Sequence, residues 1–310
     1  MATASSPGRS GGRFTLGVVA VAVLLSAGYV GMVAHWKKAA SFGENNVQAN
    51  LIRLEAYVHR GEGEVGLVGS SMTARLLPGY FEPLSVDNVA VDGGSAAYGL
   101  KLILRKERLA MKVCLIEINT LTRPADGNEA LLDEAMAQPQ RKMGAWFPIL
   151  RPAYRPSSVL YSALKLEMDL SAEATAEGPL AVKTPILVRA REGVRSVASP
   201  VSLQKAATPE VEEARRMIAR LMERGVKVIF FSIPTGGARQ PSDPLDPLAN
   251  LLLKELPGAV FVDLASEFER EGHTPSYTDG IHLTAGSAQY AASVLEKAVI
   301  AAGFLPQSPQ

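Results

Sequence analysis

Cysteine is nearly absent from this chain, and that scarcity excludes several kinds of site. One cysteine occurs among 310 residues, so neither an internal disulfide nor a zinc site built on cysteines can form. Cys114 lies inside the apolar run Val113-Cys114-Leu115-Ile116, where a cysteine normally serves as a small core residue. We therefore expect it to be buried and unreactive.

The chain also lacks an excess of charge of either sign. Its formal net charge is +1, and no basic cluster of the kind that binds phosphate backbones stands out. A nucleic-acid partner is therefore disfavoured. Histidine is scarce as well, with four residues, and no clustered set of metal ligands is visible, so we expect neither a metal nor another cofactor.

What the chain does have is one long uncharged apolar run near its start. Residues 14–34 have about the 20-residue length of a helix that crosses a lipid bilayer. That length favours a retained anchor over a cleaved signal peptide, whose apolar core spans about 7 to 15 residues. Two basic residues on each side leave the positive-inside rule nearly balanced. We predict a single-pass inner-membrane protein with a cytoplasmic tail at 1–13 and its main domain on the extracytoplasmic, or periplasmic, side.

Beyond the anchor, strand and helix patterns alternate. Residues 35–61 contain one apolar helical stripe, which indicates a juxtamembrane stalk or a packing helix. Apolar runs that end at turn residues follow, separated by helices with capping signals; the predicted strands are 65–68, 86–91, 112–118, 226–233 and 259–264. Such alternation predicts an α/β fold: a three-layer, flavodoxin-like, mostly parallel sheet with helices on both faces.

We place this domain at residues 62–302, followed by a C-terminal tail at 303–310. The stretch 123–207 is too long for an ordinary connection between a strand and a helix. We interpret it as an insertion, either a cap or lid over the crevice or a surface elaboration with its own small core.

One short predicted strand ends at a turn that carries two hydroxyls, Gly69-Ser70-Ser71. Open α/β sheets bind their ligands at the carboxyl ends of such strands. A serine there needs a base to become a nucleophile, and donors to stabilise an oxyanion. The candidate base is His282 in Asp279-Gly280-Ile281-His282, because a carboxylate three residues away can fix its tautomer and stabilise its charged form. Taken alone, this spacing also fits a surface loop with no catalytic role.

Several separated stretches together resemble the SGNH, or GDSL-type, hydrolases. Gly69-Ser70-Ser71 is similar to their nucleophile block, Asn88-Val89-Ala90-Val91-Asp92-Gly93 to their glycine block, and Asp279-Gly280-Ile281-His282 to their aspartate–histidine block. Asn119 occupies the place of their asparagine block. The resemblance implies Ser71 as nucleophile, His282 as general base and Asp279 as its orienting carboxylate. It also implies an oxyanion hole formed by the N–H groups of Ser71 and Gly93 with the amide of Asn119.

Two departures from the family's pattern affect these assignments. Ser70 stands where the family carries an aspartate, and Glu117-Ile118 replaces the usual glycine spacer ahead of Asn119. Serine at the first position resembles membrane-anchored members that move acyl groups onto envelope polymers, such as the teichoic-acid D-alanylation proteins. We expect Ser70 to be a turn residue, and Glu117 to be hydrogen-bonded behind the site or partly exposed.

The resemblance and the anchor together imply an extracytoplasmic serine acyl-ester enzyme, either an esterase or an O-acyltransferase. Its partners would be the lipid bilayer, an acylated carbohydrate or envelope polymer, and a membrane protein that donates the acyl group. Hydrolysis and transfer share one acyl-enzyme, so the sequence leaves that choice open. The alternative is a catalytically inactive binding or assembly subunit of an envelope polysaccharide system.

Overall fold

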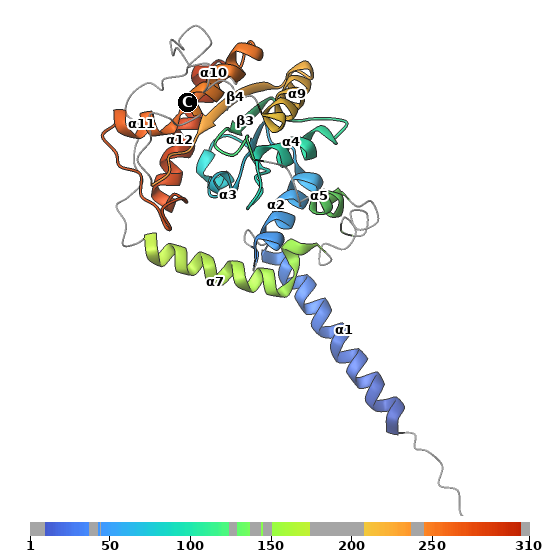
Figure 1. Ribbon diagram of the computed structural model, residues 1–310. Helices are drawn as coiled ribbons and strands as arrows, with labels where there is room; N and C mark the ends of the chain where they lie inside the picture. The colour runs from blue at the N-terminus through green and yellow to red at the C-terminus, as the bar shows by residue number, and fades with distance from the viewer. Residues whose placement is uncertain are drawn as a thin grey trace, which may run out of the picture.

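A five-stranded parallel sheet forms the centre of the protein. The computed structural model describes residues 10–36, 43, 45–123, 129–136, 144, 151–173, 208–236 and 245–304. The strand order is β2-β1-β3-β4-β5, and the strands are β1 (Val65–Val68), β2 (Val86–Asn88), β3 (Val113–Glu117), β4 (Lys227–Ser232) and β5 (Val260–Asp263). This sheet with its flanking helices confirms the predicted α/β fold (Figure 1).

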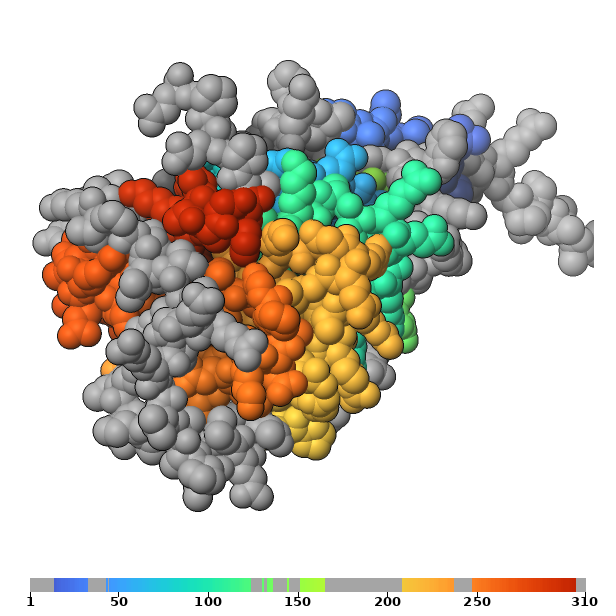
Figure 2. All heavy atoms as spheres, turned by 90° about the horizontal axis from the view of Figure 1, so that it is seen from above, coloured from blue at the N-terminus to red at the C-terminus, as the bar shows by residue number. Residues whose placement is uncertain are grey.

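Helices cover both faces of the sheet, and alternate strand residues serve the two faces. Cys114 and Ile116 pack on one side, Val113 and Leu115 on the other, as the two-residue period of a strand requires. The first face carries α2 (Asn46–Arg60), α4 (Ala96–Leu104), α9 (Pro209–Glu223) and α10 (Leu245–Glu255); the second carries η1 (Pro78–Phe81), α11 (Leu264–Arg270) and α12 (Ala285–Ala301). Figure 2 shows α9 in yellow and α10 in orange side by side on the outer surface.

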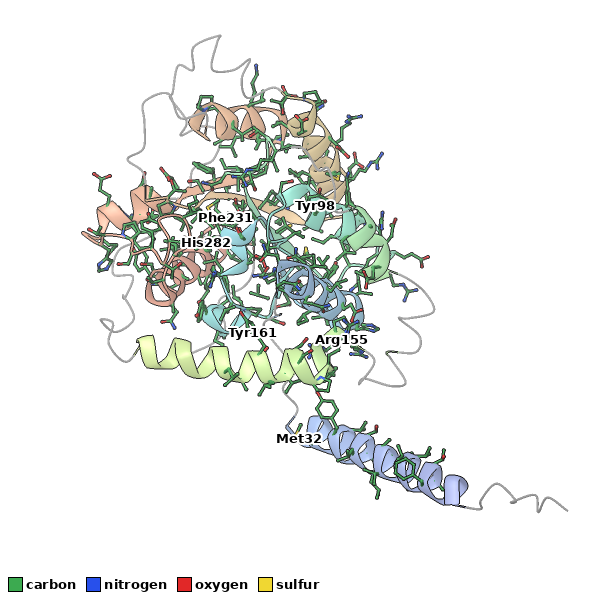
Figure 3. The ribbon with its side chains drawn as sticks, turned by 60° about the horizontal axis from the view of Figure 1, so that its bottom comes forward. Met32, Tyr98, Arg155, Tyr161, Phe231 and His282 are labelled. Carbon is green, nitrogen blue, oxygen red and sulfur yellow. The ribbon has the colours of Figure 1, made fainter. Side chains whose placement is uncertain are left out.

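The predicted apolar helix is α1 (Ser10–Trp36), which projects from the domain (Figure 1). Its window Phe14–Met32 is long and apolar enough to cross a membrane, and it fits either a signal anchor or a signal sequence. The hydroxyl of Tyr29 donates to the carbonyl of Tyr154 at 2.7 Å, in η3 (Pro152–Tyr154). Figure 3 shows Met32 on the same side of the domain as Tyr161 of α7 (Pro156–Glu173).

Helix α2 belongs to the packed domain and is not a free stalk. Leu51, Leu54 and Tyr57 are at most 3% exposed and join the core cluster on the first face of the sheet. The side chain of Asn45 caps the helix by accepting from the N–H of Gln48. The packed domain therefore begins upstream of residue 62, and α2 is the packing helix that the sequence allowed.

Strand β2 and helix α11 are two of the elements that differ from the predicted pattern, and part of the chain cannot be compared. β2 ends at Asn88, three residues earlier than predicted. Helix α11 follows β5 directly, and the sequence did not predict it because seven residues are too few to show a helical period. Within the predicted insertion at 123–207, the structure describes α5 (Glu129–Met136), residue 144, η3 and α7. Residues 124–128, 137–143, 145–150 and 174–207 of the insertion, and most of both predicted tails, lie outside the described residues.

The core assignment can be tested by truncating one leucine from the centre of the sheet. Leu115 in β3 is fully buried, so Leu115→Ala should lower the free energy of unfolding by about 2–5 kcal/mol. Leu160 on α7 is 62% exposed, and Leu160→Ala should change it by less than about 0.5 kcal/mol. Chemical denaturation of the full chain in detergent measures both; equal losses would contradict the assigned core.

Candidate active site

Ser71 is the first residue of a short helix that begins where β1 ends. The helix is α3 (Ser71–Ala74), and Ser70 caps it: the backbone of Ser70 is extended and its Oγ accepts from the N–H of Met72 at 3.3 Å. β1 lies between β2 and β3, so the chain winds outward in opposite directions on its two sides. Doubly wound folds bind ligands at the carboxyl edge of the sheet at such a point.

His282 lies in the loop before α12, and its side chain reaches Ser71 across 211 positions of sequence. Nε2 of His282 lies 2.9 Å from Oγ of Ser71, and Nδ1 lies 2.6 Å from Oδ2 of Asp279. When the Nδ1 proton is donated to the carboxylate, Nε2 carries the lone pair and can accept the serine proton. The three side chains thus form a continuous serine–histidine–aspartate hydrogen-bond chain.

Asp279 orders its own loop as well as the imidazole. Its Oδ1 accepts from the backbone N–H groups of His282 at 2.9 Å and Ile281 at 3.1 Å. The backbone N–H of His282, the imidazole and the N–H of Ile281 hold the pKa of Asp279 well below its usual range. Because the Asp279 side chain is 52% exposed, water screens its charge, and orienting the imidazole is its main effect.

A buried carboxylate lies directly behind the serine turn, Gly69-Ser70-Ser71. Glu117, the last residue of β3, is fully buried. Its oxygens accept from the N–H of Ser70 at 2.8 Å, from Oγ of Ser70 at 2.9 Å, from Oγ1 of Thr73 at 2.6 Å and from Oγ1 of Thr120 at 3.2 Å. Four donors satisfy the carboxylate, which a buried polar group requires. Glu117 therefore fixes the turn that presents Ser71.

The same close packing explains why glycine precedes the two serines. A Cβ at Gly69 would lie 2.2 Å from Oγ1 of Thr73 and 2.5 Å from Oε2 of Glu117, so a larger residue would displace the network. The sequence indicated Ser70 as a turn residue and Glu117 as a group behind the site, and the structure places both there. It did not indicate Thr73 or Thr120, because an isolated threonine carries no recognisable pattern.

The glycine turn, from Val91 to Gly94, follows β2 and lies beside the serine turn. The N–H of Val91 donates to the carbonyl of Gly69 at 3.0 Å, and the N–H of Gly94 donates back to Val91 at 2.9 Å. Between them Gly93 has a φ of +75°, a conformation that favours glycine. The predicted donor Gly93 therefore lies in the turn that follows β2, the strand next to β1.

Asn119 follows β3, on the other side of β1, and is fixed by the backbone after β4. Its Oδ1 accepts from the N–H of Ile233 at 2.8 Å, and its Nδ2 donates to the carbonyl of Ile233 at 2.9 Å. An amide nitrogen carries two N–H groups, so this pairing leaves one for a further acceptor. The segments that follow the neighbouring strands β2, β1 and β3 thus carry Gly93, Ser71 and Asn119 respectively.

Two other kinds of chemistry find no support among the described residues. In that part of the chain, no group of three or more His, Cys, Asp or Glu side chains is placed to hold a metal ion. Cys114 is fully buried in β3, and burial raises the pKa of its thiol to about 12, which keeps the thiol protonated.

Comparison with known proteins identifies no relative. No family model, no curated protein and no solved structure matches the chain. A functional assignment therefore rests on the residues and on the geometry that joins them.

The role of Glu117 can be tested by replacing its carboxylate with an amide. Glu117→Gln puts an NH₂ group where hydroxyl and amide donors converge, so the unfolding free energy should fall by about 2 kcal/mol and Ser71 should react more slowly with a fluorophosphonate. Glu64→Gln, at an exposed carboxylate paired with Lys112, is the control and should change neither by much. Native stability and labelling rate in Glu117→Gln would contradict the role.

Proposed function

We propose that this chain is a membrane-anchored, extracytoplasmic serine acyl-ester enzyme of the SGNH type, acting as an esterase or an O-acyltransferase. The observation that carries the proposal is the 2.9 Å contact between Oγ of Ser71 and Nε2 of His282. The order of the four sequence blocks supports the same family. The apolar helix α1 supports retention at the inner membrane, through residues 14–34.

In the proposed first half-reaction, Ser71 becomes acylated. His282 Nε2 removes the hydroxyl proton while Oγ bonds to the acyl carbon of a donor ester, and the carbonyl oxygen becomes an oxyanion. The N–H groups of Ser71 and Gly93, with Nδ2 of Asn119, are the donors assigned to that oxyanion. Collapse of the intermediate breaks the bond to the leaving alcohol, which takes the proton from His282.

In the second half-reaction, an acceptor removes the acyl group. Water or a carbohydrate hydroxyl attacks the acyl carbon, His282 takes the acceptor's proton, and that proton returns to Oγ of Ser71 as it leaves. Tethering by α1 would raise the local concentration of an acyl donor supplied by a membrane protein. The resemblance to family members that move acyl groups onto envelope polymers makes an acylated carbohydrate or envelope polymer the proposed substrate class.

The proposal predicts that Ser71 carries all covalent reactivity. Full-length protein in detergent should label with a fluorophosphonate and hydrolyse an aryl acetate, and Ser71→Ala should abolish labelling and lower kcat by at least about a thousandfold. Ser157→Ala, at an exposed hydroxyl on α7, is the matched control and should match the native protein. Adding an oligosaccharide acceptor separates the two activities, because a transferase yields acylated sugar.

Equal rates for the native protein and Ser71→Ala would refute the enzyme assignment. An unlabelled native protein that still binds an envelope polysaccharide would instead identify the alternative, a catalytically inactive binding subunit with the same fold. The departures at Ser70 and at the residues before Asn119 motivate that alternative. The hydrogen bonds that satisfy Glu117 favour an intact site over a decayed one.

A further inference from the structure

The glycine turn is of a kind whose central peptide can take either of two orientations. The turn runs from Val91 to Gly94, closed by the 2.9 Å bond between its ends, and Gly93 at its third position has a φ of +75°. These features match a type II turn, in which the third residue takes a φ near +80°. A type I turn reverses the central peptide, and glycine tolerates both forms. The direction of the Gly93 N–H therefore depends on contacts outside the turn.

Asn50, on the buried side of α2, makes those contacts. It is 2% exposed; its Nδ2 donates to the carbonyl of Asp92 at 3.1 Å, and its Oδ1 accepts from the N–H of Asp92 at 2.7 Å. The carbonyl of Asp92 and the N–H of Gly93 belong to one planar trans peptide, so they point in opposite directions. Because Asn50 holds the carbonyl, the N–H of Gly93 points away from Asn50.

Arg53 reinforces this arrangement from the next turn of the same helix. Its guanidinium donates to Oδ1 of Asn50 at 2.6 Å and to Oδ2 of Asp92 at 2.6 Å. The Arg53 and Asp92 side chains are each 16% exposed, so the ion pair is largely shielded from water. Residues three apart share one face of a helix, and this face of α2 holds both the backbone and the side chain of Asp92.

We propose that Asn50 and Arg53 are positioning residues that lock the Gly93 N–H toward the oxyanion formed at Ser71. The Val91 bond to the carbonyl of Gly69, two residues before Ser71, places the turn beside the nucleophile. The inference rests on the proposed function. It makes α2, the helix that follows α1, a structural part of the oxyanion hole.

Replacing Asn50 tests the lock. Asn50→Ala frees the peptide to adopt both orientations, so kcat of the full-length protein for an aryl acetate should fall about ten- to hundredfold. KM should change less than about threefold, since an oxyanion donor acts mainly in the transition state. Leu54→Ala, at a fully buried core residue of the same helix, is the control: it should lower the free energy of unfolding and keep kcat within about twofold.

A double-mutant cycle with Gly93 separates positioning from general structural support. A Cβ at Gly93 meets no atom within 4 Å, so Gly93→Ala acts through its positive φ, which alanine disfavours. If Asn50 works through this peptide, the double variant loses little more kcat than Gly93→Ala alone. If the kcat of the double variant fell by the product of the two single losses, the positioning role would be overturned. A native kcat in Asn50→Ala would overturn it as well.

Failure of this inference and failure of the proposed function give different results. If the native protein neither labels nor hydrolyses the ester, the proposed function has failed, and the positioning role fails with it. If the native protein is active and Asn50→Ala matches it, only the positioning role is overturned. Arg53→Lys adds a graded check: lysine keeps the charge but has a shorter side chain and lacks the Nη2 group that donates to both Asn50 and Asp92, so it should lose less kcat than Asn50→Ala.

Discussion

The hydrogen bond between Oγ of Ser71 and Nε2 of His282 is the contact on which the rest of the site depends. It joins residues 211 positions apart, so no local preference can form it. The parallel sheet brings them together, because β1 ends at the serine turn and the loop before α12 returns to the same edge. The backbone N–H of Gly236, after β4, donates a 2.8 Å hydrogen bond to the carbonyl of Gly280 in that loop.

Each candidate reactive group is held by a polar group that the reaction itself does not consume. Glu117 from β3 holds the serine turn, Asn50 from α2 holds the glycine turn, and Asp279 holds the imidazole. The first two are long-range contacts with backbone groups. Leaving a buried donor or acceptor unpaired costs about 1–3 kcal/mol, so these contacts stabilise one geometry of the two turns. They link the packing of the sheet to the geometry of the candidate site.

The sequence predicted the sheet well because its strands are short apolar runs that stop at turn residues. It indicated the Asp279–His282 pair by its three-residue spacing, but the meeting of that pair with Ser71 only through the order of motifs that resemble a family. It could not reveal Asn50 or Arg53, since their partner Asp92 is 42 and 39 residues away. In addition, Asn50 bonds to the backbone of Asp92, which carries no sequence pattern. For the same reason α2 was open to interpretation as a stalk: an apolar stripe shows that a helix packs, but not on what.

A structure of the full-length protein after reaction with a fluorophosphonate tests the central claim most directly. The phosphorus should be bonded to Oγ of Ser71, with a phosphoryl oxygen about 3 Å from the N–H of Gly93 and from Nδ2 of Asn119. His282 should still contact Asp279. Phosphorus on another residue, or a phosphoryl oxygen that faces solvent without these donors, would contradict the assignment of the site.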